Sequence, residues 1–154
     1  MIAKKEWVSL EEALGLVLGR LETRLGSRKV EVRKVHSLPL IQCDFSLTAD
    51  VIRNILMNSL QYSRPNSALI IQGSETENDI SIQFLDEGPG ISAQFLTSLF
   101  DRFSREQPHI PGGLGLGLSI CRGFMEAMNG SIEAQNRTDG TSGSSVKITF
   151  KKGS

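Results

Sequence analysis

The order of helical and strand-like segments constrains the fold of this chain more than any other feature of its sequence. Segments with helical spacing of apolar residues alternate with pairs of strand-like segments, in the order α-β-β-α-β-β-α-α-β-β. Paired strands favour hairpins, whereas a regular strand–helix–strand alternation would favour a dinucleotide-binding fold. The chain is therefore predicted to be an α+β protein, a two-layer sandwich with helices on one face of a mixed or largely antiparallel sheet.

Capping and turn residues set the boundaries of these segments. Ser9 followed by two glutamates begins the first helix, and Asn129-Gly130 is a left-handed C-cap signal for the last one. The helices are predicted over residues 9–25, 46–62, 92–100 and about 114–128, and the strands over 30–35, 38–43, 69–74, 80–85, 131–136 and 145–151. The last two strands are expected to form a closing hairpin.

Two asparagines lie on one face of the helix predicted over 46–62. Asn54 and Asn58 are four residues apart, so both amides leave the same face, with Tyr62 one turn further on. An asparagine carbonyl is a neutral hard oxygen, which suits a magnesium ion whose other ligands are waters and phosphates. Most polar helix faces only meet water, so this face taken alone is equally consistent with a solvated surface.

A short glycine loop, Asp86-Glu87-Gly88-Pro89-Gly90, directly follows the strand predicted over 80–85. A carboxylate at the end of a strand can accept a hydrogen bond from the amino group of an adenine. Gly88 and Gly90 would allow the backbone to approach a flat ring closely. The same residue types form ordinary turns, so the loop by itself leaves both interpretations open.

A second glycine motif, Gly112-Gly113-Leu114-Gly115-Leu116-Gly117-Leu118, opens the helix predicted from residue 114. Each glycine in a helix costs up to ~1 kcal/mol relative to alanine, so the alternation indicates that another group must approach closely. Free backbone amides at a helix start form a seat for phosphate. The motif follows no strand and precedes no Gly-Lys-Ser/Thr, so it is neither a Rossmann nor a Walker loop.

The segment between the two glycine motifs has aromatic and basic residues and no predicted structure in its second half. Phe100 and Phe103 are three apart and can anchor one end, which leaves Arg102 and Arg105 free to reach an anion. A loop of this length often acts as a lid over a ligand, although a plain surface loop can have the same composition.

Charge and cysteine content limit the classes of partner. Seventeen basic residues balance seventeen acidic ones, so no net field attracts nucleic acid or anionic lipid, and neither is expected as a partner. Cys43 and Cys121 have apolar neighbours and no metal-ligand spacing, which favours buried free thiols over a disulfide. The apolar runs are too short to span a bilayer, so no direct membrane contact is expected.

Taken in order, these motifs resemble the N, G1, F and G2 boxes of sensor histidine kinases, whose catalytic domain shares a superfamily with gyrase B, Hsp90 and MutL. The resemblance covers about residues 44–150. It implies the Bergerat, or histidine-kinase ATPase, fold, with three helices on one face of the sheet and ATP under a mobile lid. It also implies that residues 30–152 are the ATP-binding catalytic domain and that residues 1–29 are a linker and N-terminal helix.

The resemblance further implies roles for individual residues, with ATP and Mg²⁺ as cofactors. Asp86 would recognise the adenine amino group, Asn58 would bind magnesium, and Arg105 would reach the phosphates from the lid. Tyr62 would pack against the base. The full set of implied nucleotide-binding residues is Asn54, Asn58, Tyr62, Asp86, Gly88, Gly90, Ile91, Arg105, Gly113, Leu114, Gly115, Leu116 and Gly117.

Three positions depart from the family pattern. Met57 stands where an acidic residue is common and Gln61 where a lysine is usual, which implies one weaker contact to a phosphate or on the adenine side. Ser144 replaces the usual threonine of the closing G-T-x-F strand. A narrower likeness, to potassium-responsive KdpD-type sensors, rests on Glu6-Trp7-x-Ser9-Leu10-Glu11-Glu12, Ile120-Cys121-Arg122 and Ala134-x-Asn136-Arg137.

The residue type at position 54 bears on the reaction. In the ATPase branches of the superfamily a glutamate at this place prepares a water, whereas an amide cannot act as a general base at neutral pH. In-line transfer of a phosphoryl group to a protein nucleophile is therefore predicted. An ATPase of the gyrase or Hsp90 type and a degenerate nucleotide-binding module are the alternatives.

The chain offers no credible phosphoryl acceptor, and no residue is predicted to be catalytic in that sense. His36 and His109 are its only histidines, and both lack an acid–base partner in sequence. The resemblance implies a protein-histidine kinase of a two-component system, whose partners are its own dimerisation and phosphoacceptor helical domain and a response regulator. It implies a cytoplasmic domain of an inner-membrane sensor.

Overall fold

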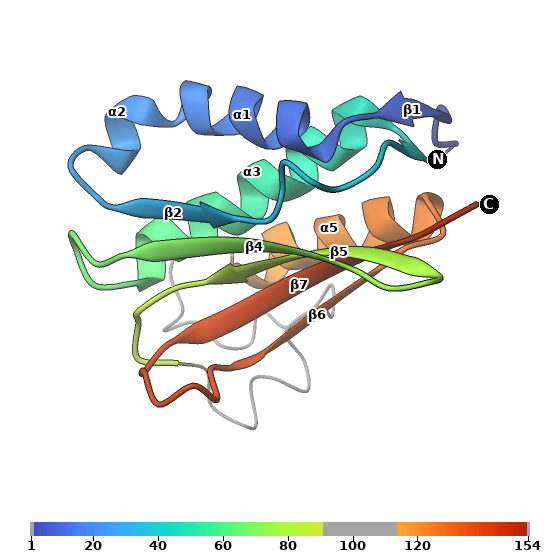
Figure 1. The fold of residues 1–154 in the computed structure, drawn as a ribbon. Helices are drawn as coiled ribbons and strands as arrows, with labels where there is room; N and C mark the ends of the chain where they lie inside the picture. Colours follow the sequence, from blue (N-terminus) through green and yellow to red (C-terminus); the bar gives the residue numbers. More distant parts are fainter. Residues whose placement is uncertain (1, 91–113, 154) are drawn as a thin grey trace.

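The computed structural model describes residues 2–90 and 114–153, with only the backbone for residues 114–116. Its main element is a five-stranded sheet with strand order β2-β4-β5-β7-β6 (Figure 1). β2 (Val30–Arg33) runs parallel to β4 (Leu69–Glu75), and all other neighbours are antiparallel. The remaining strands are β5 (Asp79–Leu85), β6 (Ser131–Asn136) and β7 (Ser144–Lys151). The predicted mixed, mostly antiparallel sheet is confirmed.

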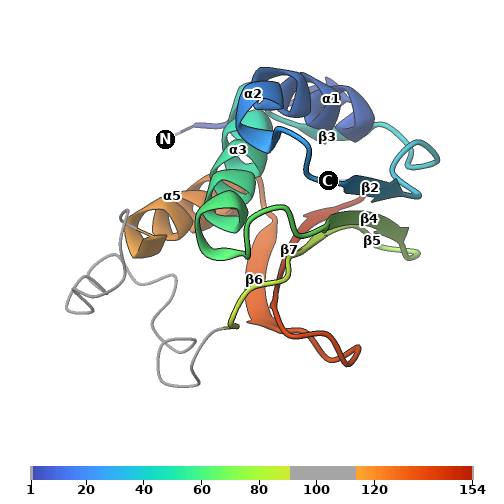
Figure 2. The same cartoon turned by 90° about the vertical axis from the view of Figure 1, so that its left-hand side faces the viewer.

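Helices of the described residues lie together on one face of this sheet (Figure 2). α3 (Phe45–Tyr62) is central and contacts both α1 (Leu10–Arg20) and α5 (Leu114–Ala127). The single turn α2 (Glu22–Leu25) follows α1. This arrangement confirms the two-layer α+β sandwich. In the two described stretches, none of the helices is both long and apolar enough to cross a membrane.

The core lies between α3 and the sheet. Ile52 and Ile55 of α3 are at most 1% exposed, and Ile71, Ile82 and Ile148 on the central strands are fully buried. Burying one such side chain stabilises the fold by ~1.5–3 kcal/mol. Leu10, Ala13, Leu14 and Val17 of α1 belong to the same core. A domain boundary at residue 30 remains a prediction, although α1 packs within this core.

Local signals explain the limits of α3 and α5. Asp44 caps α3 because its carboxylate accepts a hydrogen bond of 3.0 Å from the amide of Leu47. Ser63 is the C-cap of that helix, and Pro65, which cannot continue a helix, follows two residues later. Asn129 has a φ of 60°, and the amide of Gly130 donates to the carbonyl of Met125 at 2.8 Å, so the predicted left-handed cap of α5 is confirmed.

Three predicted boundaries were wrong. The helix predicted over 9–25 divides at Leu21, whose side chain is buried in the core. The strand predicted over 30–35 ends at Arg33 because Lys34 takes a φ of 61°. Only Ile41–Cys43 of the strand predicted over 38–43 is extended, as β3, and it pairs with an unpredicted β1 (Glu6–Val8) in a separate small sheet. The helix predicted over 92–100 lies outside the described residues.

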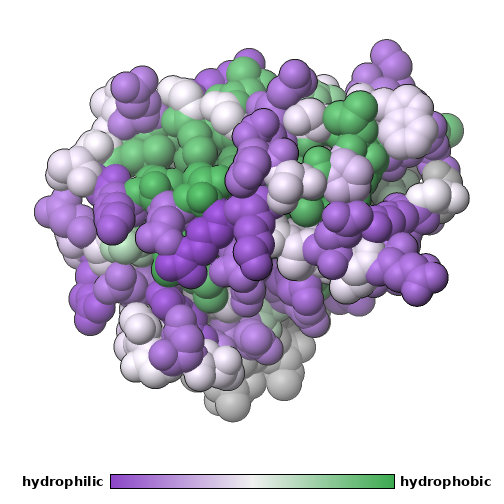
Figure 3. Space-filling view, in the orientation of Figure 1, coloured by the Kyte–Doolittle hydropathy of each residue, from purple (hydrophilic) through white to green (hydrophobic). Residues whose placement is uncertain are grey.

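The described surface includes apolar features away from the end of β5. Figure 3 shows an apolar area between α1–α2 and β2. On β2 itself, Val32 is 46% exposed. A pocket of about 630 Å³ is lined by Trp7, Leu40, Glu75 and Lys152, among others. It lies beside Ile80, near the start of β5, whereas Asp86 follows the end of that strand.

Candidate nucleotide-binding site

Asp86 is held by the first residue of β7. Because Leu85 is opposite Ser145 in the antiparallel register, Asp86 lies beside Ser144. The Ser144 amide donates to Asp86 Oδ1 at 3.0 Å, and the Ser144 hydroxyl donates to Oδ2 at 2.7 Å. The residue is 6% exposed. Its carboxylate is therefore fixed in direction, and each oxygen keeps a lone pair for a further donor.

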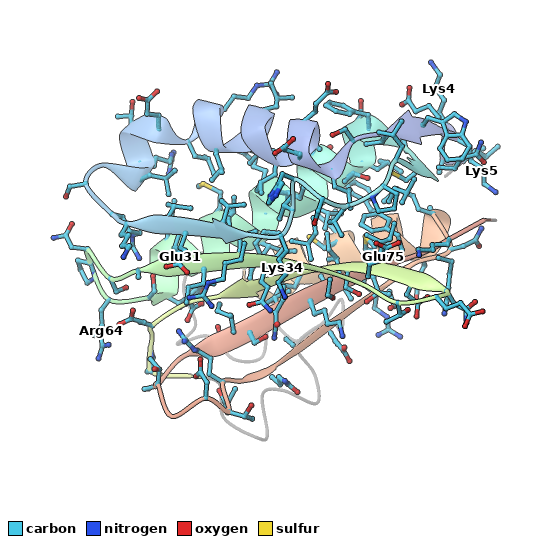
Figure 4. The ribbon with its side chains drawn as sticks, in the orientation of Figure 1. Lys4, Lys5, Glu31, Lys34, Arg64 and Glu75 are labelled. Atoms are coloured by element: carbon cyan, nitrogen blue, oxygen red, sulfur yellow. The ribbon has the colours of Figure 1, made fainter. Side chains whose placement is uncertain are left out.

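The loop after Asp86 packs against the C-terminal end of α3. A Cβ at Gly88 would lie 2.9 Å from the carbonyl oxygen of Tyr62, so a side chain there would push the helix end away. The Arg64 amide donates to the Glu87 carbonyl at 3.0 Å, and the two side chains form an ion pair at 3.1 Å. Arg64 is labelled at this end of the molecule in Figure 4. Tyr62 is thereby placed next to the loop.

Two further glycines allow the loop to meet the β6–β7 connection. Gly90 has a φ of 83°, and a Cβ there would lie 2.7 Å from Asn136 Oδ1. A Cβ at Gly143 would overlap the carbonyl oxygen of Asp86. The Ser142 hydroxyl also donates to the Gly88 carbonyl at 2.9 Å. We call the group formed by Tyr62, residues 86–90 and residues 142–144 the loop cluster.

Asn54 and Asn58 face α5, so the predicted common face is confirmed. The side-chain amide of Asn54 donates to the Asp50 carbonyl at 3.0 Å. It also contacts Cys121 of α5, whose pKa is raised to about 12 by burial. A Cβ at Gly117 would lie 4.0 Å from Asn58 Nδ2. We call Asn54, Asn58 and Gly117 the helix cluster.

One atom of the helix cluster has an unusual environment. Asn58 Nδ2 is buried, and among the described residues it has no hydrogen-bond partner. Buried polar atoms are nearly always hydrogen-bonded, so such an atom needs an explanation. Nitrogen and oxygen of a side-chain amide can be exchanged by a flip, so the buried position can be a donor or an acceptor.

The remaining predicted residues are only partly covered by the structure. Ile91, Arg105 and Gly113 lie outside the described residues, and Leu114, Gly115 and Leu116 are described only as helical backbone. Their contacts with a nucleotide remain predictions. The predicted free and buried state of both thiols is confirmed for Cys43 and Cys121.

Sequence reasoning did not identify the residues that support Asp86. Ser144 was recognised only as a departure from the family strand, and Arg137 only as part of a subfamily likeness. The predicted closing hairpin gave no indication that its second strand pairs with β5 and so brings Ser144 beside Asp86. No local signal connects Arg137 with Asp86, which lies 51 residues away.

Comparisons with known proteins agree with this geometry. Residues 44–154 match the family described as histidine kinase-, DNA gyrase B-, and HSP90-like ATPase. Two relatives, each named Sensor protein KdpD, from Clostridium acetobutylicum and Escherichia coli, are 33% identical over 152 and 149 residues. These matches cover 97% and 96% of this chain but only 17% and 16% of the relatives.

The fold has a close counterpart among solved structures. The mycobacterial sensor histidine kinase MprB superposes with a TM-score of 0.82 at 24% identity, covering 96% of this chain and 97% of that one. Fold, motifs and relatives therefore agree. The chain belongs to the histidine kinase-, DNA gyrase B- and HSP90-like ATPases, and within them to the catalytic domains of sensor histidine kinases.

Proposed function

We propose that this chain binds ATP with Mg²⁺ along α3 and donates the γ-phosphoryl group to a histidine on a separate helical domain of its parent protein. The observation that carries the proposal is the buried Nδ2 of Asn58, which lacks a partner among the described residues and lies beside Gly117. A ligand atom at this place would satisfy the amide. After a flip, the amide oxygen is a suitable ligand for Mg²⁺, which takes few protein oxygens besides phosphates and water.

The loop cluster supports recognition of adenine. The carboxylate of Asp86 accepts hydrogen bonds and has none to donate when ionised. An adenine presents an amino group to such an acceptor, whereas a guanine presents a carbonyl oxygen at the same ring position, which a carboxylate repels. Because Ser144 already fixes both carboxylate oxygens, selection of the base needs little rearrangement.

The helix cluster supports phosphoryl donation over hydrolysis. Asn54 has an amide where the ATPase branches have a glutamate, and this amide is bonded to the Asp50 carbonyl. It cannot remove a proton from water at neutral pH. The chain's own residues then act by holding the phosphates in line, while bound Mg²⁺ supplies charge neutralisation.

The partners follow from the same proposal. The parent would carry a dimerisation and phosphoacceptor helical domain, and the phosphoryl group would pass from it to a response regulator. His36 is exposed in the connection between β2 and β3, and we do not assign it as the acceptor. The parent would be an inner-membrane sensor with this domain on the cytoplasmic side.

Calorimetry with ATP and Mg²⁺ tests the binding step. The wild-type chain should bind, and Asn58→Ala and Asp86→Ala should each bind at least about tenfold more weakly. Arg122→Met is the matched control because the exposed Arg122 side chain pairs with Glu126 at 3.2 Å, on the surface of α5. Absence of ATP binding by the wild-type chain would favour the alternative of a degenerate nucleotide-binding module that acts only through partner contacts.

A transfer assay tests the reaction. The helical hairpin of the parent, added with Mg²⁺ and ATP labelled in the γ-phosphate, should acquire an acid-labile phosphate on a histidine. No transfer between folded partners counts against the kinase. Substantial ATP turnover by the domain alone would favour the ATPase alternative.

A further inference from the structure

Arg137 is a buried arginine that the nucleotide site as described above does not use. It is the first residue after β6, and its side chain is only 5% exposed. Its Nε and Nη2 donate to the two carboxylate oxygens of Asp139 at 3.1 and 2.6 Å. Its remaining nitrogen, Nη1, donates to the backbone carbonyl of Asp86 at 3.1 Å. The guanidinium therefore joins an ion pair to the loop that carries the proposed base-recognition residue.

The geometry of the hairpin connection makes this contact rigid. The Arg137 amide donates to the Gly143 carbonyl at 2.9 Å, which closes the connection on itself. The amide of Asp86 donates to the carbonyl of Ser144 at 3.0 Å, so both peptide groups that flank the Asp86 Cα are held by the same hairpin. Rotation about either backbone bond of Asp86 would break one of these hydrogen bonds, and would redirect the carboxylate.

The counter-ion has a second consequence. A guanidinium without a carboxylate partner beside Asp86 could turn and form a bidentate pair with the Asp86 carboxylate itself. Asp139 accepts from Nε and Nη2 of Arg137, which leaves Nη1 to donate to the Asp86 backbone carbonyl. Arg137 lowers the pKa of Asp139 by its hydrogen bonds, so the counter-ion stays charged at neutral pH.

We propose that Arg137, held by Asp139, is a positioning residue that aims the Asp86 carboxylate at the nucleotide base and so contributes to base selectivity. The inference rests on the proposed function, because it requires that Asp86 recognises adenine. A purely structural role for Arg137 would stabilise the hairpin and affect all nucleotides alike. The two roles differ in the ratio of affinities for two bases.

Inosine triphosphate provides that ratio, because it has a carbonyl oxygen where ATP has the amino group. Dissociation constants for both nucleotides with Mg²⁺ are measured by calorimetry on the wild-type chain and on Arg137→Met. We expect Arg137→Met to weaken ATP binding about tenfold, as for the loss of one charged hydrogen bond, and to change inosine triphosphate binding less than about twofold. Arg137→Lys keeps a positive charge on a single nitrogen and should recover part of the preference for ATP. Arg122→Met, a change at an exposed arginine, should keep all of it.

An equal loss of affinity for both nucleotides overturns the inference, and so does no loss for either. A lower unfolding temperature of the variant would then indicate a structural role for Arg137. If Arg137→Met does not fold, Arg137→Lys and Asp139→Asn decide by the same ratio, since both should reduce the preference for ATP. Asp86→Ala distinguishes a failure of this inference from a failure of the proposed function. If it removes the preference and the Arg137 variants do not, only this inference fails; if Asp86→Ala has no effect, the proposed function fails as well.

Discussion

Both oxygens of the Asp86 carboxylate accept hydrogen bonds from Ser144, whereas the buried Nδ2 of Asn58 has no partner in the part of the chain that the structure describes. The acceptor group of the loop cluster, the Asp86 carboxylate, is thus already oriented by hydrogen bonds within the protein. Its carbonyls are also held, that of Asp86 by Arg137 and that of Gly88 by Ser142. In the helix cluster the side-chain amide of Asn54 is engaged, whereas Nδ2 of Asn58 has no hydrogen-bond partner among the described residues.

This difference indicates how the two ends of a nucleotide would be bound. A preformed acceptor selects its base at low cost, because little conformational freedom remains to be lost. A buried donor without a partner costs ~1–3 kcal/mol, and a ligand that satisfies it recovers that energy on binding. The base end would therefore provide selectivity and the phosphate end would couple binding to the metal and the phosphates.

The largest expected effect tests how tightly the loop cluster is closed. Gly143→Ala would place a methyl group on the carbonyl oxygen of Asp86, so the loop or the hairpin must move. We expect a loss of several kcal/mol in the free energy of unfolding, of order 3 or more, measured by chemical denaturation. Gly123→Ala is the control: no atom of the described part of the chain lies within 4 Å of a Cβ placed there, and helix propensity should stabilise the protein by up to ~1 kcal/mol. Equal stability of the two variants would show that the loop cluster is loose.

A substitution in the helix cluster should affect stability and ATP binding in opposite directions, unlike a substitution in the loop cluster. Asn58→Ala removes a buried donor that has no partner among the residues the structure describes, so the unliganded chain should be as stable as the wild type or more stable. Its affinity for ATP with Mg²⁺ should fall at least about tenfold, and removal of Mg²⁺ with EDTA should weaken its binding less than that of the wild type.

Asp86→Ala provides the comparison for that result, because it leaves the amide and hydroxyl of Ser144 without their acceptor. It should therefore lower both ATP affinity and stability, the latter by ~1–3 kcal/mol. A strong loss of stability in Asn58→Ala would contradict the distinction between the two clusters.

A smaller effect is expected at Ser144. Ser144→Ala removes only the hydroxyl bond to Asp86 Oδ2, which we expect to cost ~1 kcal/mol in unfolding free energy and a few-fold in ATP affinity. Ser144→Thr keeps the hydroxyl and should change the stability by less than ~0.5 kcal/mol. Unfolding curves and calorimetry of the two variants measure this bond, and equal behaviour of both would rule out a role for the hydroxyl.

The smallest effect is a pH dependence at Asp139. Arg137 lowers the folded-state pKa of Asp139, so the stability gained from this carboxylate is complete above its ordinary pKa of about 3.9 and is lost as the pH falls through the lowered value. The difference in unfolding free energy between wild type and Asp139→Asn should therefore shrink at acid pH. If this difference in unfolding free energy stays constant from neutral to strongly acid pH, the Arg137–Asp139 ion pair does not contribute to stability.

Much of the fold was predictable because its signals are local. The 18 residues of α3 have a cap, a stop and one apolar face, and the prediction missed its start by a single residue. β4 and β5 were also predicted to within one residue at each end. The three-residue β1 was not, because a segment of that length is too short to show a period and forms only by pairing with β3.

By itself, the sequence determined the order of the longer described helices and strands. It also determined the common face of Asn54 and Asn58, because a spacing of four on a helix fixes direction without any tertiary contact. It also carried the family motifs. Only the tertiary structure decided which groups support Asp86, since Ser144 and Arg137 lie 58 and 51 residues away and reach it through strand pairing and a turn that no local pattern encodes. The tertiary structure likewise decided that Asn58 Nδ2 is buried without a partner in residues 2–90 and 114–153, because that state depends on how α5 packs against α3.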